Sequence, residues 1–177
     1  RTRDAFDAAA SNDSINNQTV LTAYASPTDA TKKMVSAIGA DLTTLTDVDH
    51  YEFKVTGTSI TVRLGTVGKS LLNAKVSVYD SNDNFIATAT SAGPSAMQDL
   101  VLTVNGLASG KFYTVKVEKA ANDVFGIGKY DLKVGYGFDP VSAATTTSTS
   151  YTSDSGTNNT TATATTLAPV AGSANKL

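Results

Sequence analysis

Two aspartates, Asp47 and Asp49, lie two residues apart immediately before the alternating run Tyr51, Phe53 and Val55. Side chains two apart in a strand share a face, so an extended backbone that reaches back to Asp47 places both carboxylates on one edge of the sheet. Like charges this close repel each other, which predicts a cation or several backbone N–H groups beside them. The spacing therefore indicates an ion site at the start of this strand.

Groups that could catalyse a reaction are few. The sequence has one histidine, His50, and no cysteine. Strand alternation turns His50 away from Tyr51 and Phe53, so we expect it to point outward. Neither a Ser-His-Asp arrangement nor an HExxH motif can be assembled around it. Thiolate metal sites and disulfide frameworks are excluded. The sequence predicts that the chain is not an enzyme.

Short runs with a period of two follow one another after Val55: Ile60–Leu64, Val76–Val78, Phe85–Thr88, Leu100–Val104, Tyr113–Val117 and Tyr130–Tyr136. Each run is half apolar and is bounded by Gly, Asn, Asp or Ser, which is typical of antiparallel strands with one buried and one solvated face. Because no long amphipathic helix separates them, we predict an all-β, jelly-roll-like antiparallel sandwich of seven to nine strands. The expected core positions are Tyr51, Phe53, Val62, Val78, Leu102, Val115 and Leu132.

Two segments allow more than one interpretation. After Pro27 the chain could form a short helix over Asp29–Val35, or a strand could begin at Ser36. The run Asp80–Asn84 superficially resembles the start of an EF-hand loop, but it lacks the Gly and Glu that such a loop needs at its sixth and twelfth positions. We therefore predict a hairpin turn there.

Composition bounds the domain organisation and the partners. The 177 residues suffice for one domain with a remainder, and a net charge of -2 without a basic stripe argues against nucleic acid. No apolar run is long enough for a membrane span. We predict a preceding region or linker over residues 1–10, the sandwich over 11–138, and a Thr/Ser-rich linker over 139–177. The alternative for 139–177 is the start of a second similar module, because 154–164 repeats the pattern of 13–23.

Five motifs follow one another in a fixed order: Ala10–Ser14, Asp47–Phe53, Val76–Asn84, Gly110–Val117 and Gly128–Val134. Together they resemble the bacterial pre-peptidase C-terminal domain. That family is a β-sandwich appended to secreted peptidases, and it is akin to the collagen-binding domains of clostridial collagenases. The resemblance covers residues 7–136.

The resemblance implies that Asn12 and Asp13 meet Asp47 and Asp49 around a calcium ion. This set offers carboxylate and amide oxygens, the ligands that calcium prefers. Ala10 and Ser11 stand where the family often has Glu, so that carboxylate is either missing or supplied by Asp7. The alternative is a capped turn beside a strand start, without an ion.

Alternation also turns Tyr79 and Phe112 away from the core, so they are candidates for a polymer-binding face. The favoured interpretation is a non-catalytic accessory module of a secreted or cell-surface bacterial protein, a peptidase by resemblance. Its partners would be neighbouring domains of the same polypeptide and an extracellular polymer. The alternative is an adhesive, glycan- or collagen-binding repeat of a large surface protein.

Overall fold

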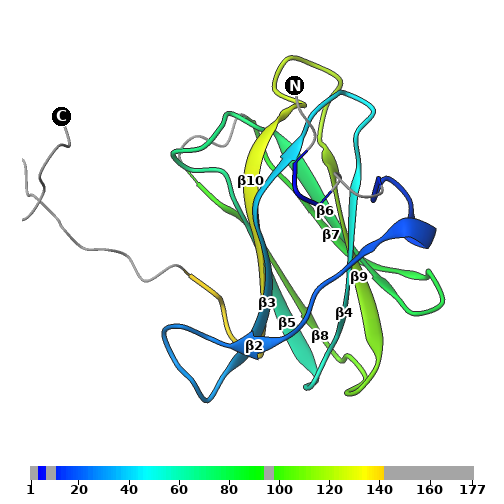
Figure 1. Ribbon diagram of the computed structural model, residues 1–177, viewed down its shortest axis with the longest axis vertical. Helices are drawn as coiled ribbons and strands as arrows, with labels where there is room; N and C mark the ends of the chain where they lie inside the picture. Colours follow the sequence, from blue (N-terminus) through cyan, green and yellow to red (C-terminus); the bar gives the residue numbers. More distant parts are fainter. Residues whose placement is uncertain (1–3, 7–10, 94–97, 142–177) are drawn as a thin grey trace, which may run out of the picture. The chain divides into compact units, whose positions relative to one another are not determined.

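The computed structural model describes residues 4–6, 11–93 and 98–141, and two five-stranded sheets form this part of the chain (Figure 1). One sheet has the order β1 (Thr19–Val20), β4 (Asp49–Lys54), β9 (Phe112–Lys119), β6 (Ala74–Asp80), β7 (Phe85–Thr90). The other has the order β2 (Tyr24–Ala25), β3 (Lys33–Leu42), β10 (Gly128–Tyr136), β5 (Ser59–Gly65), β8 (Leu100–Asn105). A single 3₁₀ turn, η1 (Ile15–Asn17), lies among the described residues.

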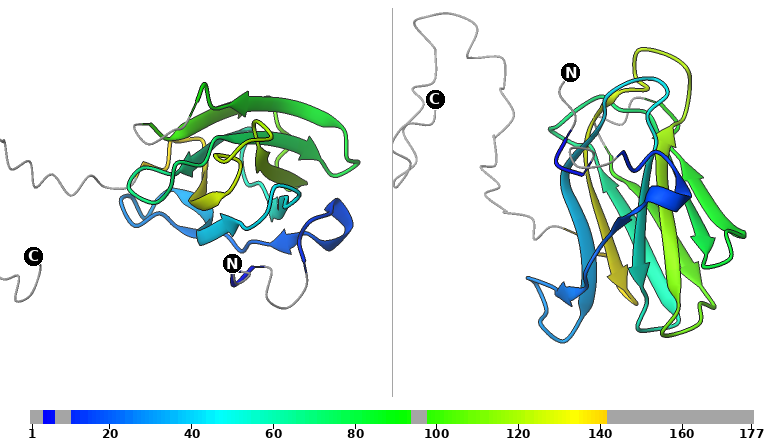
Figure 2. Two further views of the ribbon diagram at one scale, coloured as in Figure 1. Left: turned by 90° about the horizontal axis from the view of Figure 1, so that it is seen from above. Right: turned by 45° about the vertical axis from the view of Figure 1, so that its right-hand side comes forward.

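The strand order is that of a jelly roll. The strands from β3 to β10 form two four-stranded orders, β3-β10-β5-β8 and β4-β9-β6-β7, with antiparallel pairing throughout. Seen from above, the two sheets lie face to face (Figure 2). The predicted fold class is confirmed. The described part of the chain has ten strands rather than seven to nine, because β1 and β2 hold two residues each and leave no alternating run in the sequence.

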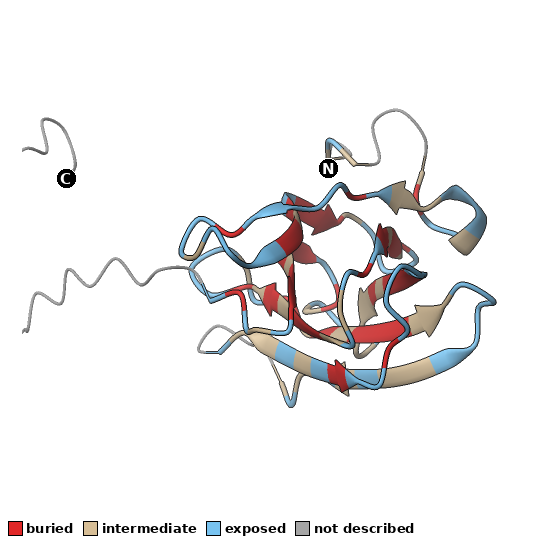
Figure 3. Cartoon of the chain, turned by 90° about the horizontal axis from the view of Figure 1, so that it is seen from below, coloured by how far each residue is buried: buried red, intermediate tan, exposed pale blue. Residues whose placement is uncertain are grey.

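Side chains from the inner faces of both sheets form the core, where the buried residues gather (Figure 3). Six of the seven predicted core positions are buried: Tyr51, Phe53, Val62, Val78, Val115 and Leu132. Leu102 is only partly buried. It lies on β8, the edge strand of its sheet, so one side of it has no neighbouring strand to cover it.

The ambiguous segment after Pro27 is a strand, so the helical alternative is wrong. β3 starts at Lys33, three residues before the predicted Ser36, and follows a turn in which the Lys32 N–H donates to the Asp29 carbonyl at 3.0 Å. Long-range pairing decides the outcome, because Met34 and Val35 join the β10 ladder. Local helix propensity is too weak to compete with such pairing.

The Asp80–Asn84 segment is the predicted hairpin turn between β6 and β7. The Asp80 carboxylate accepts the N–H groups of Asn82 at 2.8 Å and Asn84 at 3.0 Å, and Asp83 takes a positive φ of 63°.

No helix in the described residues has the length and apolar character needed to cross a membrane. Of the predicted linker over 139–177, residues 139–141 are described. The remainder, which contains the proposed repeat at 154–164, lies outside the described residues. Of the predicted N-terminal region, only residues 4–6 are described.

Candidate functional site

A buried hydrogen-bonded chain centres on Asp49, the first residue of β4. Asp49 has 0% exposure, and its carboxylate accepts a short hydrogen bond from the Tyr130 hydroxyl on β10. The Tyr130 hydroxyl lies 2.9 Å from the Tyr51 hydroxyl. Because the Tyr130 proton goes to Asp49, the Tyr51 hydroxyl is the donor to Tyr130. Two tyrosines from opposite sheets thus meet one buried carboxylate across the core.

Burial and the nearby carboxylate both hold the tyrosines in their neutral form. Desolvation is the larger effect and raises the pKa of Tyr51 and of Tyr130 well above the usual value, and the charge of Asp49 adds to it. Each neutral phenol keeps its proton, so Tyr130 donates to Asp49 and Tyr51 donates to Tyr130. The arrangement therefore stabilises a buried charge with O–H donors drawn from two strands.

Asp47 has different partners from Asp49. Its carboxylate accepts a short hydrogen bond from the Thr43 N–H and one of 2.7 Å from the Thr43 hydroxyl. The Asp47 N–H in turn donates to the Thr44 carbonyl at 3.3 Å. Asp47 therefore closes the turn that joins β3 to β4.

Asn12 holds the N-terminal segment against β4. It is buried, its backbone carbonyl accepts the His50 N–H at 3.0 Å, and the same carbonyl lies 3.1 Å from His50 Nδ1. His50 lies on the outer face of the sheet, as predicted, but it is only 7% exposed because this segment covers it. Burial lowers the pKa of His50, so Nδ1–H of the neutral ring donates to Asn12.

The residues before Asn12 contact the same region. The Asp4 carboxylate accepts the Asp41 N–H at 2.6 Å, and the Phe6 ring packs edge-to-face on Tyr51 with centroids 5.8 Å apart. Asp13, the fourth predicted ligand, is exposed. The N-terminal segment thus reaches the Tyr51 end of the buried cluster through residues that the sequence did not single out.

Calcium needs six to eight oxygens directed at one point. Here the carboxylate of Asp47 accepts from Thr43, that of Asp49 accepts from Tyr130, and Asp13 is exposed. No group of three or more His, Cys, Asp or Glu side chains in the described part of the chain is arranged to hold a metal ion. A calcium ion at the predicted ligands would therefore compete with the Thr43 and Tyr130 donors.

The predicted binding face lies on the outer side of the sheet that contains β4. Phe112 on β9 is 42% exposed, and Tyr79 on β6 is half-buried. Tyr79 pairs with Thr114, two residues from Phe112, so the two rings lie diagonally on neighbouring strands. Phe85 on β7 packs edge-to-face on Tyr79 at 6.0 Å and is itself exposed. The outer face therefore carries three aromatic rings near one end.

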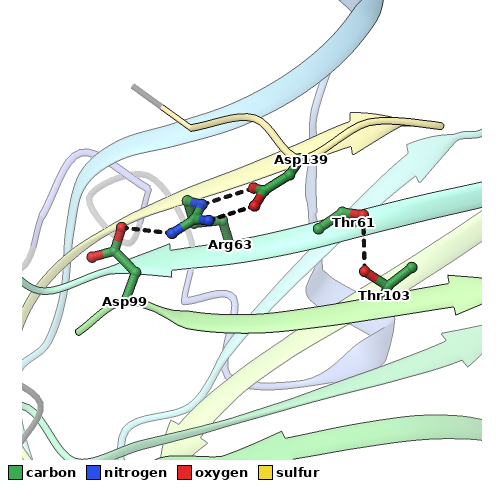
Figure 4. Close-up of polar contacts among 5 residues, drawn as sticks. All are labelled: Thr61, Arg63, Asp99, Thr103 and Asp139. Carbon is green, nitrogen blue, oxygen red and sulfur yellow. Dashed lines mark hydrogen bonds and ion pairs between the residues drawn. The ribbon is translucent and has the colours of Figure 1, made fainter. Parts of the chain in front are cut away.

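The sequence reasoning missed Arg63 on the outer face of the other sheet. Arg63 Nε donates to Asp139 at 2.8 Å, and its Nη1 lies 3.1 Å from Asp99 (Figure 4). An arginine at an outward position of an otherwise apolar-alternating run was the available signal. Its two carboxylate partners could not be paired with it from the sequence alone.

No family model matches the sequence, and a search of curated proteins finds no match. Among solved structures, the chain is similar to the pre-peptidase C-terminal domain of collagenase from Bacillus anthracis, with 17% identity, a TM-score of 0.43, and coverage of 66% of this chain and 95% of that one. Tripeptidyl peptidase 2 matches with 9% identity and a TM-score of 0.49 over 67% of this chain and 10% of that chain. The carbohydrate-binding module CBM36 in complex with calcium and xylotriose matches with 17% identity and a TM-score of 0.31 over 64% of this chain and 85% of that one. The first is a domain of the family that the five sequence motifs resemble, and the likeness concerns the fold.

Proposed function

We propose that this chain is a non-catalytic accessory module of a secreted or cell-surface bacterial peptidase, which holds a neighbouring domain of the same polypeptide in a fixed orientation. The observation that supports the proposal is the attachment of residues 12–21 along the edge of β4. In a simple linker these residues would be free to move. Here they are bonded to the sandwich at several separate points.

The attachment runs from Asn12 to Leu21. β1 pairs in parallel with β4, and the Leu21 N–H donates to the Glu52 carbonyl at 2.8 Å. The Gln18 side-chain carbonyl accepts the Thr114 hydroxyl at 2.7 Å, which ties the segment to β9 as well. Each such hydrogen bond contributes about 1 kcal/mol. Several hydrogen bonds along one segment resist its local opening, so the segment can hold the domain before it in a fixed orientation relative to the sandwich.

Amide hydrogen exchange on the 177-residue chain tests the attachment. We expect the amides of Leu21 and His50 to exchange nearly as slowly as those of the core strands, because both donate to carbonyls of the opposite segment. Gln18→Ala should speed exchange at Leu21 while leaving β10 unchanged. Exchange at Leu21 as fast as in an unstructured peptide would contradict the proposed role.

The accessory role is tested in the intact parent polypeptide. Deleting residues 11–138 should lower the thermal stability of the neighbouring domain, or its attachment to an insoluble substrate, while turnover of a small soluble substrate persists. The isolated chain should hydrolyse neither casein, gelatin nor glycans. Complete loss of turnover of the small substrate on deletion, or hydrolysis by the isolated chain that a point substitution abolishes, would show a catalytic role instead.

The aromatic rings on the outer face of the β4 sheet favour a second candidate function, adhesion to an extracellular polymer such as collagen or a glycan. Phe112 and Phe85 are exposed, and aromatic rings supply large contact areas at low entropic cost. Retention of the chain on insoluble collagen or cellulose, weakened by Phe112→Ala, would support this function. Retention that does not change in this variant would remove the face from consideration.

Calcium stabilisation is a separate proposal. An ion held by Asn12, Asp13, Asp47 and Asp49 would have to compete with the Thr43 and Tyr130 donors described above. Binding would therefore be weak, in the range of about 0.1–1 mM known for extracellular modules.

A further inference from the structure

Two adjoining pockets lie on the outer face of the sheet that contains β10, opposite to the aromatic face. The first, of about 220 Å³, is lined by charged side chains from β5, β10 and the loops beside them. The second, of about 180 Å³, is lined mainly by Tyr24, Met34, prolines and Val141. Lys133 lines both pockets, so they meet at this residue.

The strand register explains why these side chains gather. Across the sheet, Ser36 on β3 pairs with Lys133 on β10, Lys133 with Arg63 on β5, and Arg63 with Val101 on β8. Tyr24 on β2 pairs with Met34 on β3. Directly opposed residues of an antiparallel pair point to the same face. Two adjacent rows of outward side chains result: a charged row passes through Lys133 and Arg63, and a second row, two residues away along β3, contains Tyr24 and Met34.

The segment after β10 crosses this face and supplies Pro140 and Val141 to the lining of the second pocket. A Cβ added to Gly135 would lie 3.0 Å from a ring carbon of Phe138 and against its carbonyl, so Phe138 rests directly on the strand. Asp139 then binds Arg63 (Figure 4), and the next residue, Pro140, is buried. Pro140 lines the second pocket, while Arg63 lines the first.

The charges of the first pocket balance. Arg63, Lys69 and Lys133 face Asp99, Asp131 and the Asp139 bonded to Arg63, so three cations meet three carboxylates. Lys69 lies 3.1 Å from Asp131, and Arg63 is 17% exposed between its two partners. A formally neutral site gives no net attraction for a polyanion or a polycation. Its walls nevertheless offer both donors and acceptors at fixed positions.

We propose that this pair of pockets binds a neutral oligosaccharide. A sugar hydroxyl can donate to a carboxylate and accept from an ammonium or guanidinium group at the same time, which is the combination that the first pocket presents. The apolar C–H face of an adjacent ring suits Tyr24, Met34 and the prolines of the second pocket. Each pocket is smaller than the roughly 300–1,000 Å³ of a drug-sized ligand site, so each suits one ring and a longer chain spans both.

The inference goes beyond the accessory role proposed above and does not depend on it. Fast amide exchange in residues 12–21 would contradict the accessory role without affecting sugar binding by the pockets. Absence of sugar binding would likewise leave the exchange result unchanged. It also differs from the adhesion candidate, because Tyr79 and Phe112 lie on the opposite sheet. Variants on the two faces therefore distinguish oligosaccharide binding by the pockets from polymer adhesion through the aromatic face, and amide exchange tests the accessory role separately.

Calorimetric titration of the 177-residue chain with cellohexaose, xylohexaose, mannohexaose and maltohexaose tests the proposal. We expect at least one of these to bind at millimolar concentration or below. Lys133→Met and Tyr24→Ala should each weaken binding about five- to tenfold, as the loss of one hydrogen bond or one stacking contact does. Lys116→Met is the matched control, since Lys116 is a partly exposed outward lysine in the middle of β9 on the opposite sheet.

A melting curve of each variant establishes that it is folded, and Lys69→Met replaces Lys133→Met if the latter unfolds. Absence of binding by all four neutral hexasaccharides at millimolar concentration would overturn the proposal. So would weakening by Lys116→Met equal to that by Lys133→Met, or binding seen only with a galacturonate hexasaccharide or a collagen-like peptide.

Discussion

Tyr130→Phe removes the hydroxyl that joins Tyr51 to Asp49 and keeps the ring in the core. Hydrogen bonds to charged groups contribute about 1.5–3 kcal/mol, and neutral ones about 0.5–1.5 kcal/mol. Because Tyr130 donates to the fully buried Asp49 and accepts from Tyr51, we expect the free energy of unfolding to fall by about 2–4 kcal/mol. This would be a large share of the 5–15 kcal/mol that a domain typically has.

Urea denaturation of the 177-residue chain measures this loss, with an unchanged m-value as the sign that the fold persists. Tyr136→Phe is the matched control, since its hydroxyl donates to the Lys54 carbonyl at 3.0 Å and touches no charge. It should cost about 1 kcal/mol. Tyr51→Phe should cost less than Tyr130→Phe, and the double variant less than the sum of both. Equal losses for Tyr130→Phe and Tyr136→Phe would refute the charge-assisted chain.

Three further outcomes follow from the described contacts. Burial lowers the pKa of His50 in the folded chain below the unfolded value of about 6.5, so the unfolded chain is protonated first as the pH falls. The contribution of His50 to the free energy of unfolding should therefore be complete above about pH 6.5 and decrease as the pH drops toward the folded pKa. In a pH series of urea midpoints, His50→Gln should remove this decrease. Millimolar calcium should raise the melting temperature slightly relative to a chelator, and Asp13→Ala should abolish the rise. An identical melting temperature with calcium and with the chelator would mean that hydrogen-bond donors of the protein alone stabilise Asp47 and Asp49. Gly135→Ala should cost about 1–3 kcal/mol because its Cβ meets the Phe138 carbonyl, whereas Gly57→Ala, with open space around the added atom, should cost much less by the same denaturation assay.

The strands and their inner faces could be predicted because alternation is a local property. Phe53 and Val115 are two residues of a core that the period of two identifies without any knowledge of pairing. β1 and β2 could not be predicted, since a strand of two residues is defined by its partner rather than by its own sequence. The same holds for β3, which begins earlier than its own residues indicate because β10 extends its ladder.

The candidate site was harder to predict, because its contacts join residues that lie far apart in the sequence. Asp49 and Tyr130 are separated by 81 positions, and Arg63 and Asp139 by 76. The spacing of Asp47 and Asp49 predicted that their charges need stabilisation, but it did not indicate which groups supply it. Thr43 and Tyr130 hydroxyls do so in this structure, and neither residue type marks an ion site in a sequence. Alternation likewise turned His50 outward without indicating that Asn12 would cover it.

The two outer faces follow one architectural rule that limits where a ligand can bind. Along the β4 sheet, residues 12–21 cover His50 and the edge of the sheet, and they leave Phe112 exposed and Tyr79 half-buried. Along the β10 sheet, Phe138 covers Gly135, and the two pockets that share Lys133 lie on the same face. A bare sheet face is nearly flat. A segment that lies across it makes the surface concave, so a small ligand bound there loses most of its contact with water. The pockets make the β10 face the candidate for recognising a single chain of sugars, and the exposed rings of Phe85 and Phe112 make the outer face of the β4 sheet the candidate for contact with the surface of a polymer.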